Sequence, residues 1–139
     1  MLDVAQALQG AAQLLANAKY ATAAAINAAA AAVDVSKFVQ ERALIAILNE
    51  DTTATTTLAI QHSDTSGGTY TDVDADVLSD PVTGTQVALS DLNAKQFQLI
   101  GINTGKIKRY LKITATTDPT TVNGAAINAL FLGCLRHTA

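Results

Sequence analysis

From residue 43 onward, short stretches of the chain alternate apolar and polar positions, which is typical of β-strands. The run ALIAIL at 43–48 is apolar throughout and predicts a strand covered on both faces. In the stretch 108–116, the expected inward residues are Leu111, Ile113 and Ala115, and the expected outward residues are Tyr110, Lys112 and Thr114. Strands are predicted over 43–48, 55–63, 69–73, 85–90, 95–102, 108–116 and 125–135. With Gly, Asp, Asn and Pro turns between them, they predict a mainly β fold, an antiparallel β-sandwich or jelly roll.

The first 32 residues differ in composition, being rich in Ala, Gln, Asn and Leu. Asp3 can cap a helix, and apolar residues recur at helical spacing from Val4 to Leu15, so a helix is expected over residues 3–18. Residues 21–36 are compatible with either a helix or an extended segment that leads into the sheet. The predicted organisation is an Ala-rich N-terminal helix or arm at 1–32 and a β-sandwich domain at 33–139.

The composition and net charge argue against several kinds of binding partner and cellular environment. The 139 residues are 49% hydrophobic with a net charge of −3, which gives no strong field to attract nucleic acid or an anionic membrane. A basic segment followed by an apolar run is missing at the start, and no run of about 18 apolar residues occurs, so neither a signal peptide nor a membrane span is expected. Cys134 is the sole cysteine, which excludes an intrachain disulfide and suits folding in a reducing cytoplasm.

Charged residues cluster in two places. Four of the nine basic residues are Lys106, Lys108, Arg109 and Lys112, whereas a stretch without Lys or Arg contains Asp64, Asp72, Asp74, Asp76 and Asp80. Two such patches could bind a partner or another copy of the chain, or could simply be two solvated edges.

Three residues with catalytic potential, His62, Ser63 and Asp64, stand side by side in LAIQHSDTSGGTYTDV. Adjacent side chains on a strand point to opposite faces, whereas a Ser–His–Asp triad is assembled from separate segments. Asp64 to Gly68 are turn-forming residues, so the stretch predicts a β-hairpin, with the His62 ring either at the edge of the core or packed on the loop. We therefore expect no catalytic residues.

Metal and cofactor sites are not expected either. Asp72, Asp74 and Asp76 would share one face of a strand and could gather around Ca²⁺, but the EF-hand pattern fails and a solvated acidic face is the preferred interpretation. Cys134 and His137 are too few for zinc, and the apolar surroundings of Cys134 predict a buried thiol. No nucleotide-binding or hydrolase motif occurs.

Several motifs resemble those of small structural proteins of tailed bacteriophages. They are the Gln61-x-Ser63-Asp64 turn, the short strand from Thr69 to Val73, the strand from Arg109 to Ile113, and the closing Leu132-Gly133. The stretch 33–48 resembles the segment that opens such sandwiches, and the resemblance covers roughly 33–133.

This resemblance implies a non-enzymatic virion protein, assembled in the host cytoplasm, that acts as capsid cement or decoration and stabilises the head shell. Its implied partners are the major capsid protein or another virion protein, and further copies of itself. The alternatives are a tail or head–tail connector component, or a small carbohydrate-binding module. We expect attachment through the apolar N-terminal residues and the basic cluster, namely Val4, Leu8, Leu14, Leu15, Lys106, Lys108, Arg109 and Lys112; the N-terminal helix could instead cap its own sandwich.

Overall fold

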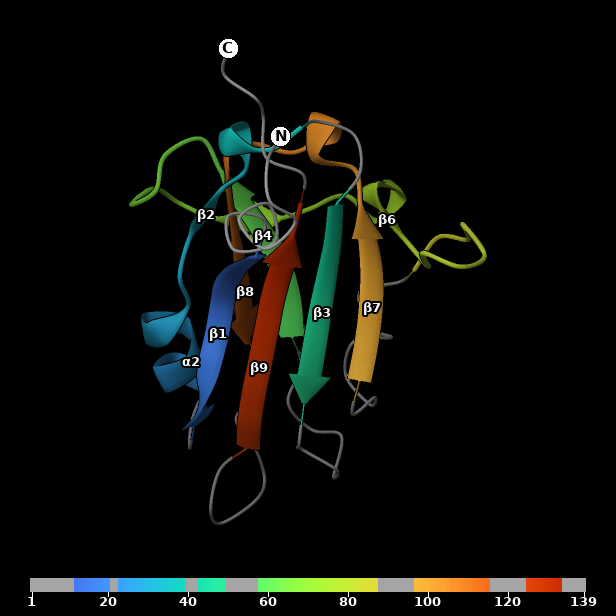
Figure 1. Ribbon diagram of the computed structural model, residues 1–139. Helices are drawn as coiled ribbons and strands as arrows, with labels where there is room; N and C mark the ends of the chain where they lie inside the picture. Colours follow the sequence, from blue (N-terminus) through green and yellow to red (C-terminus); the bar gives the residue numbers. More distant parts are fainter. Residues whose placement is uncertain are drawn as a thin grey trace, which may run out of the picture.

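Two antiparallel sheets packed face to face form the fold (Figure 1). The computed structural model describes residues 12–20, 23–39, 43–49, 58–87, 97–115 and 125–133. The five-stranded sheet has the order β1-β9-β3-β7-β6, with the strands Ala12–Tyr20 (β1), Ala125–Leu132 (β9), Ala43–Asn49 (β3), Phe97–Ile102 (β7) and Leu78–Ser79 (β6). The four-stranded sheet has the order β2-β8-β4-β5, with the strands Val33–Asp34 (β2), Tyr110–Ala115 (β8), Leu58–Ser63 (β4) and Thr71–Asp72 (β5). The expected mainly β, antiparallel sandwich is confirmed.

Strand β8 shows why these sequences form strands. Its burial alternates along the whole strand, with Leu111, Ile113 and Ala115 buried and the residues between them half-buried, as the alternation in the sequence predicts. On the facing sheet, Ile45 and Ile100 are buried to the same degree. The core therefore lies between the two sheets, where apolar side chains from both inner faces leave water.

One end of this core is closed by aromatic packing. Phe38 lies against Phe131 on β9, with ring centroids 4.9 Å apart and planes at 67°, an edge-to-face arrangement. A Cβ atom on Gly133 would lie only 2.8 Å from the Phe38 ring and 3.0 Å from the Phe131 ring. A glycine at this position therefore lets the two rings approach the end of β9.

The N-terminal part of the chain differs from its prediction. A helix was expected over residues 3–18, but Ala12–Tyr20 form β1, which pairs with β9 from Ala12↔Leu132 to Tyr20↔Ala125. The prediction is wrong for 12–18, because alanine's modest helix preference is outweighed by a ladder of hydrogen bonds to a neighbouring strand. This stretch is thus part of the sandwich and not an arm beside it, while residues 1–11 lie outside the described residues.

Residues 21–36 combine both structures that the sequence left open. Helix α2 spans Ala23–Ala29 and is followed by β2 and by a 3-10 turn, η1, at Val35–Lys37. Ile26 anchors α2 because its side chain is fully buried in the core. Figure 1 shows α2 beside β1, at the side of the sandwich.

Asn27 on α2 continues the edge of the four-stranded sheet. β2 pairs with β8 only at Leu111 and Tyr110. At Ala115, farther along β8, the side chain of Asn27 donates from Nδ2 to the carbonyl oxygen (2.8 Å) and accepts from the backbone N–H at Oδ1 (2.6 Å). One amide side chain therefore makes the two hydrogen bonds that a neighbouring strand would make.

Two strand predictions need correction. The strand expected at 85–90 is represented, within the described residues, only by an isolated bridge from Gln86 to Ser79. On the side of β7 away from β3, the paired strand is β6, which the sequence did not predict because it has only two residues. Between them, the Asp80 carboxylate accepts from the N–H groups of Val82 and Thr83, and Gly84 takes the positive φ of 72° that the turn requires.

Candidate functional site

The adjacent His62, Ser63 and Asp64 lie at the end of strand β4 and in the turn that follows, and each side chain has its own structural contact, with Lys108 or with Thr65. His62 Nδ1 accepts the backbone N–H of Lys108 at 3.2 Å, and Asp64 forms an ion pair with the Lys108 ammonium at 3.6 Å. Ser63 is buried, and its hydroxyl accepts the N–H of Thr65 at 3.3 Å. The three side chains thus hold the turn and the neighbouring loop together, and they do not converge on one another.

The environment of His62 also favours a structural role. Burial and, next, the nearby Lys108 charge lower its pKa, so its ring is neutral at physiological pH. A neutral ring keeps the Nδ1 lone pair available for the Lys108 N–H.

The acidic residues do not gather into one site. Asp72 lies on β5 and accepts from Gln61 Nε2 at 2.8 Å, Asp74 precedes the 3-10 turn η2 (Ala75–Val77), and Asp76 lies within it and pairs with Lys106 at 3.1 Å. The shared face expected from the sequence is therefore not formed. Within the described ranges, no three His, Cys, Asp or Glu residues lie close enough together to hold a metal ion. Cys134 and His137 lie outside those ranges.

Each residue of the basic cluster has a partner within the chain. Lys106 and Lys108 pair with Asp76 and Asp64, and the Lys112 ammonium lies 4.9 Å from the centre of the Tyr70 ring. Arg109 binds Asp34 through two hydrogen bonds, Nη2 to Oδ2 at 2.9 Å and Nε to Oδ1 at 3.2 Å.

The Arg109 contact, with help from Ser36, holds the pKa of Asp34 far below its usual range against the opposing effect of burial. Two residues of the basic cluster, Lys106 and Lys108, thus pair with two of the acidic cluster, and binding of another molecule by the basic residues stays a prediction.

The predicted N-terminal contact residues divide between two regions. Val4 and Leu8 lie outside the described residues. Leu14 and Leu15 lie on β1, where Leu14 pairs with Leu130 and the register shifts before Ala16, so the backbone is irregular at Leu15. The structure thus places these two residues in the sheet, and a role in attachment stays a prediction.

The most unusual surface is the outer face of the five-stranded sheet. It carries large apolar side chains that no described part of the chain covers completely: Phe97 is 60% exposed, Leu99 43%, Leu48 40% and Leu130 38%. We call this surface, completed by the half-buried side chains of the same rows, the apolar face: Leu44, Leu48, Phe97, Leu99, Leu130 and Leu132.

Strand register arranges these residues in rows across the sheet. The middle row is Leu130–Ala46–Leu99, so a small side chain lies between two leucines. The row on one side is Asn128–Leu48–Phe97, and the row on the other is Leu132–Leu44–Gly101. The face thus has raised positions at Phe97 and the leucines, and low positions at Ala46 and Gly101.

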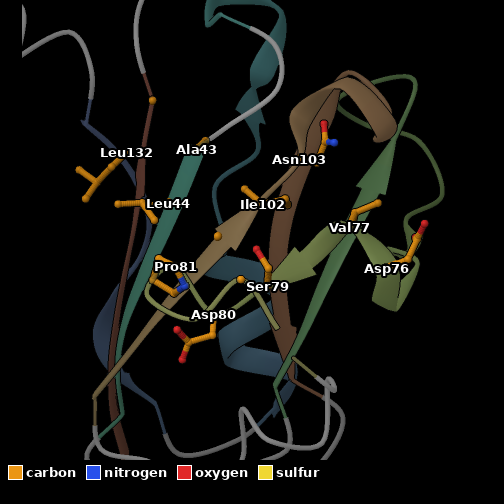
Figure 2. Close-up of a pocket in the computed structure, with 13 residues that line it drawn as sticks. Ala43, Leu44, Asp76, Val77, Ser79, Asp80, Pro81, Ile102, Asn103 and Leu132 are labelled. Atoms are coloured by element: carbon orange, nitrogen blue, oxygen red, sulfur yellow. The ribbon is translucent and has the colours of Figure 1, made fainter. Parts of the chain in front are cut away.

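A groove of about 730 Å³ opens at the Gly101 end of the apolar face (Figure 2). Leu44 and Leu132 line one part of it, and Ser79, Asp80 and Pro81 line another. A Cβ atom at position 101 would lie 2.9 Å from Ser79 Oγ, so this close approach of β6 depends on glycine. The groove is therefore an apolar hollow with a polar rim.

Sequence analysis missed this face, although a signal for it was present. The apolar run at 43–48 predicts cover on both faces, but only the inward residues Ala43, Ile45 and Ile47 are buried. Within the part of the chain that the structure describes, cover on the second face is incomplete: Leu44 and Ala46 are half-buried, and Leu48 is 40% exposed. The apolar run therefore coincides with the apolar face.

The chain matches no protein-family model, and no curated protein matches it significantly. Among the helices described, none is long and apolar enough to cross a membrane.

Proposed function

We propose that this protein is a non-enzymatic structural protein of a bacteriophage virion, of the capsid cement or decoration type, which binds the head shell and stabilises it. The observation that carries the proposal is the apolar face. The largest contiguous apolar surface of a soluble protein is often a site of interaction. A protein whose uncovered surface is apolar is suited to assembly with other proteins.

The residues with reactive potential support the same conclusion. His62, Ser63 and Asp64 hold a turn, and the basic residues contact acidic or aromatic side chains of their own chain. A nucleophile needs a base within hydrogen-bond reach and a site for the reacting atom. The contacts made by these three residues leave them without that arrangement.

The resemblance to structural proteins of tailed phages supports the virion in particular. Its motifs fall on the turn after β4, on β5, on β8 and at the end of β9, which are elements of the sandwich. This distribution fits motifs that maintain a fold, and it favours a structural scaffold over a reactive centre.

The decisive experiment is the protein composition of purified virions from the phage or prophage that encodes the chain. We expect quantitative mass spectrometry to find the protein in many copies in heads separated from tails, and gold-labelled antibody to mark the shell. A protein found only in tails would contradict the decoration role, and a protein missing from intact particles would contradict any virion role.

A variant tests the non-enzymatic part. Substitution of His62, Ser63 and Asp64 together by Ala should destabilise the turn but leave incorporation into particles largely intact. If the variant folds and is incorporated normally, yet loses a hydrolytic activity that the wild type has, the non-enzymatic assignment is wrong.

A further inference from the structure

We propose that the apolar face binds the same face of a second copy of this chain, so that two five-stranded sheets pack against each other in a two-fold dimer. The proposal rests on the proposed function only in treating the molecule as an assembly protein. It names the partner and the surface, and it can be tested on the purified protein without any virion.

The charge distribution favours a second copy as the occupant. The apolar face has no charged side chain among its six defining residues or at Ala46, although the chain has a net charge of −3. Two like-charged molecules repel unless the contacting surfaces are free of that charge. Two copies can thus meet through these residues without placing like charges opposite each other, and the nearby acidic residues Asp76 and Asp80 line the groove, opposite the uncharged Phe97 of the other copy.

The area of the face is sufficient for a dimer of moderate affinity. If a large apolar side chain offers about 200 Å² when fully exposed, the four most exposed members of the face contribute about 360 Å² per copy. Two copies, with the flanking atoms of Leu44, Leu132 and the sheet edge, would bury about 1,000 Å² in total, close to the lower limit of specific interfaces. We therefore expect a dissociation constant in the micromolar range.

The raised and low positions of the apolar face favour one arrangement of the two copies. A two-fold axis that runs across the strands along the middle row places Leu99 of one copy opposite Leu99 of the other, and it exchanges the outer rows. Phe97, the most exposed side chain of the face, then lies over the groove beside Gly101 of the second copy. Each Phe97 side chain, a raised position, therefore lies over the low position at Gly101 of the other copy, once on each side of the axis.

Molar mass in solution tests the dimer directly. The full-length wild type should have the mass of a dimer by sedimentation equilibrium, and Leu99→Asp should weaken association at least 100-fold, because each copy would bury a carboxylate opposite another. The control is Val39→Asp, which places the same charge at a 49% exposed apolar residue outside the face and should leave the dimer intact. A wild type that stays monomeric at about 100 µM would overturn the proposal, since it excludes micromolar affinity.

Cross-linking tests the arrangement and does not depend on the folding of the Leu99→Asp variant. In a Cys134→Ser background, Leu99→Cys should form covalent dimers with a bismaleimide that spans about 8 Å, because facing sheets lie about 10 Å apart. Phe97→Cys should not cross-link to itself, since the two copies of that position are offset along the strands by about 14 Å. Cross-linking of both variants, or of neither, would overturn this packing. Because virion composition decides the decoration role separately, either proposal can fail without the other.

Discussion

The outer faces of the two sheets differ although their inner faces are alike. Across the middle of the four-stranded sheet, register aligns Asp72, Gln61 and Lys112, whereas the middle row of the five-stranded sheet is Leu130, Ala46 and Leu99. The first row is held by the Gln61–Asp72 hydrogen bond and by the contact of Lys112 with Tyr70, both compatible with water. The second row consists only of apolar side chains.

This difference separates two requirements that act on a sandwich. Folding requires that the inner faces of both sheets be buried. The core between the two sheets is formed mainly by Ile, Leu and Val side chains. The outer faces reflect what surrounds the folded molecule. A polar outer face indicates solvent, and an apolar one indicates a partner, which is why the five-stranded sheet carries the interaction proposed here.

The largest expected effect comes from a charge on an inner face. Ile113→Asp on β8 places a carboxylate at a fully buried position and should cost more than about 4 kcal/mol, enough to unfold most of the protein. Circular dichroism and urea unfolding measure it. The matched control is the neighbouring Lys112→Gln on the outward face, which should cost less than about 1 kcal/mol. A stable, native-like Ile113→Asp protein would show that β8 does not face the core.

A smaller loss is expected where α2 completes the polar sheet. Asn27→Ala removes both hydrogen bonds to Ala115 and leaves a part-buried backbone N–H and C=O without them, so the free energy of unfolding should fall by about 2–3 kcal/mol. Asn27→Asp keeps an acceptor for the N–H but loses the donor to the carbonyl, so it should also destabilise. Denaturant titration distinguishes these results from an unchanged stability, which would mean that the amide does not act as a strand partner.

The ion pair at the edge of the four-stranded sheet predicts a pH dependence. Asp34 normally titrates near 3.8, and its pKa in the folded protein is lowered, chiefly by its hydrogen bonds to Arg109. A lowered folded pKa means that the unfolded state binds the proton first, so the contribution is present above pH 3.8 and is lost as the pH falls toward the folded value. Acid titration of stability should therefore be less steep below pH 4 in Asp34→Asn than in the wild type. Parallel curves would contradict the lowered pKa.

The smallest effect is expected in the middle of the polar face. Asp72→Ala removes one exposed hydrogen bond from Gln61 and should change the free energy of unfolding by less than about 0.5 kcal/mol, because water replaces the lost partner. It should also leave the molar mass in solution unchanged. A change of association state in Asp72→Ala would move the interface to the four-stranded sheet and remove the distinction between the two faces.

The sequence by itself determined the class of fold, which residues of β8 face inward, and where the turn after β4 lies. Alternation with a period of two is a local property, and Leu111, Ile113 and Ala115 show it without help from other segments. Turn residues are equally local, so the hairpin turn at Asp64 to Gly68 could be predicted.

Only the tertiary structure decided the places where distant segments meet. The Ala-rich stretch 12–20 is a strand because β9 supplies hydrogen-bond partners more than a hundred residues away, and local propensity alone favours a helix there. The pairing of Lys108 with Asp64 and of Arg109 with Asp34 needs the same long-range placement. Whether the second side of the 43–48 strand is covered depends on the layers around it, and the two sheets of the described residues leave Leu48 on that side 40% exposed.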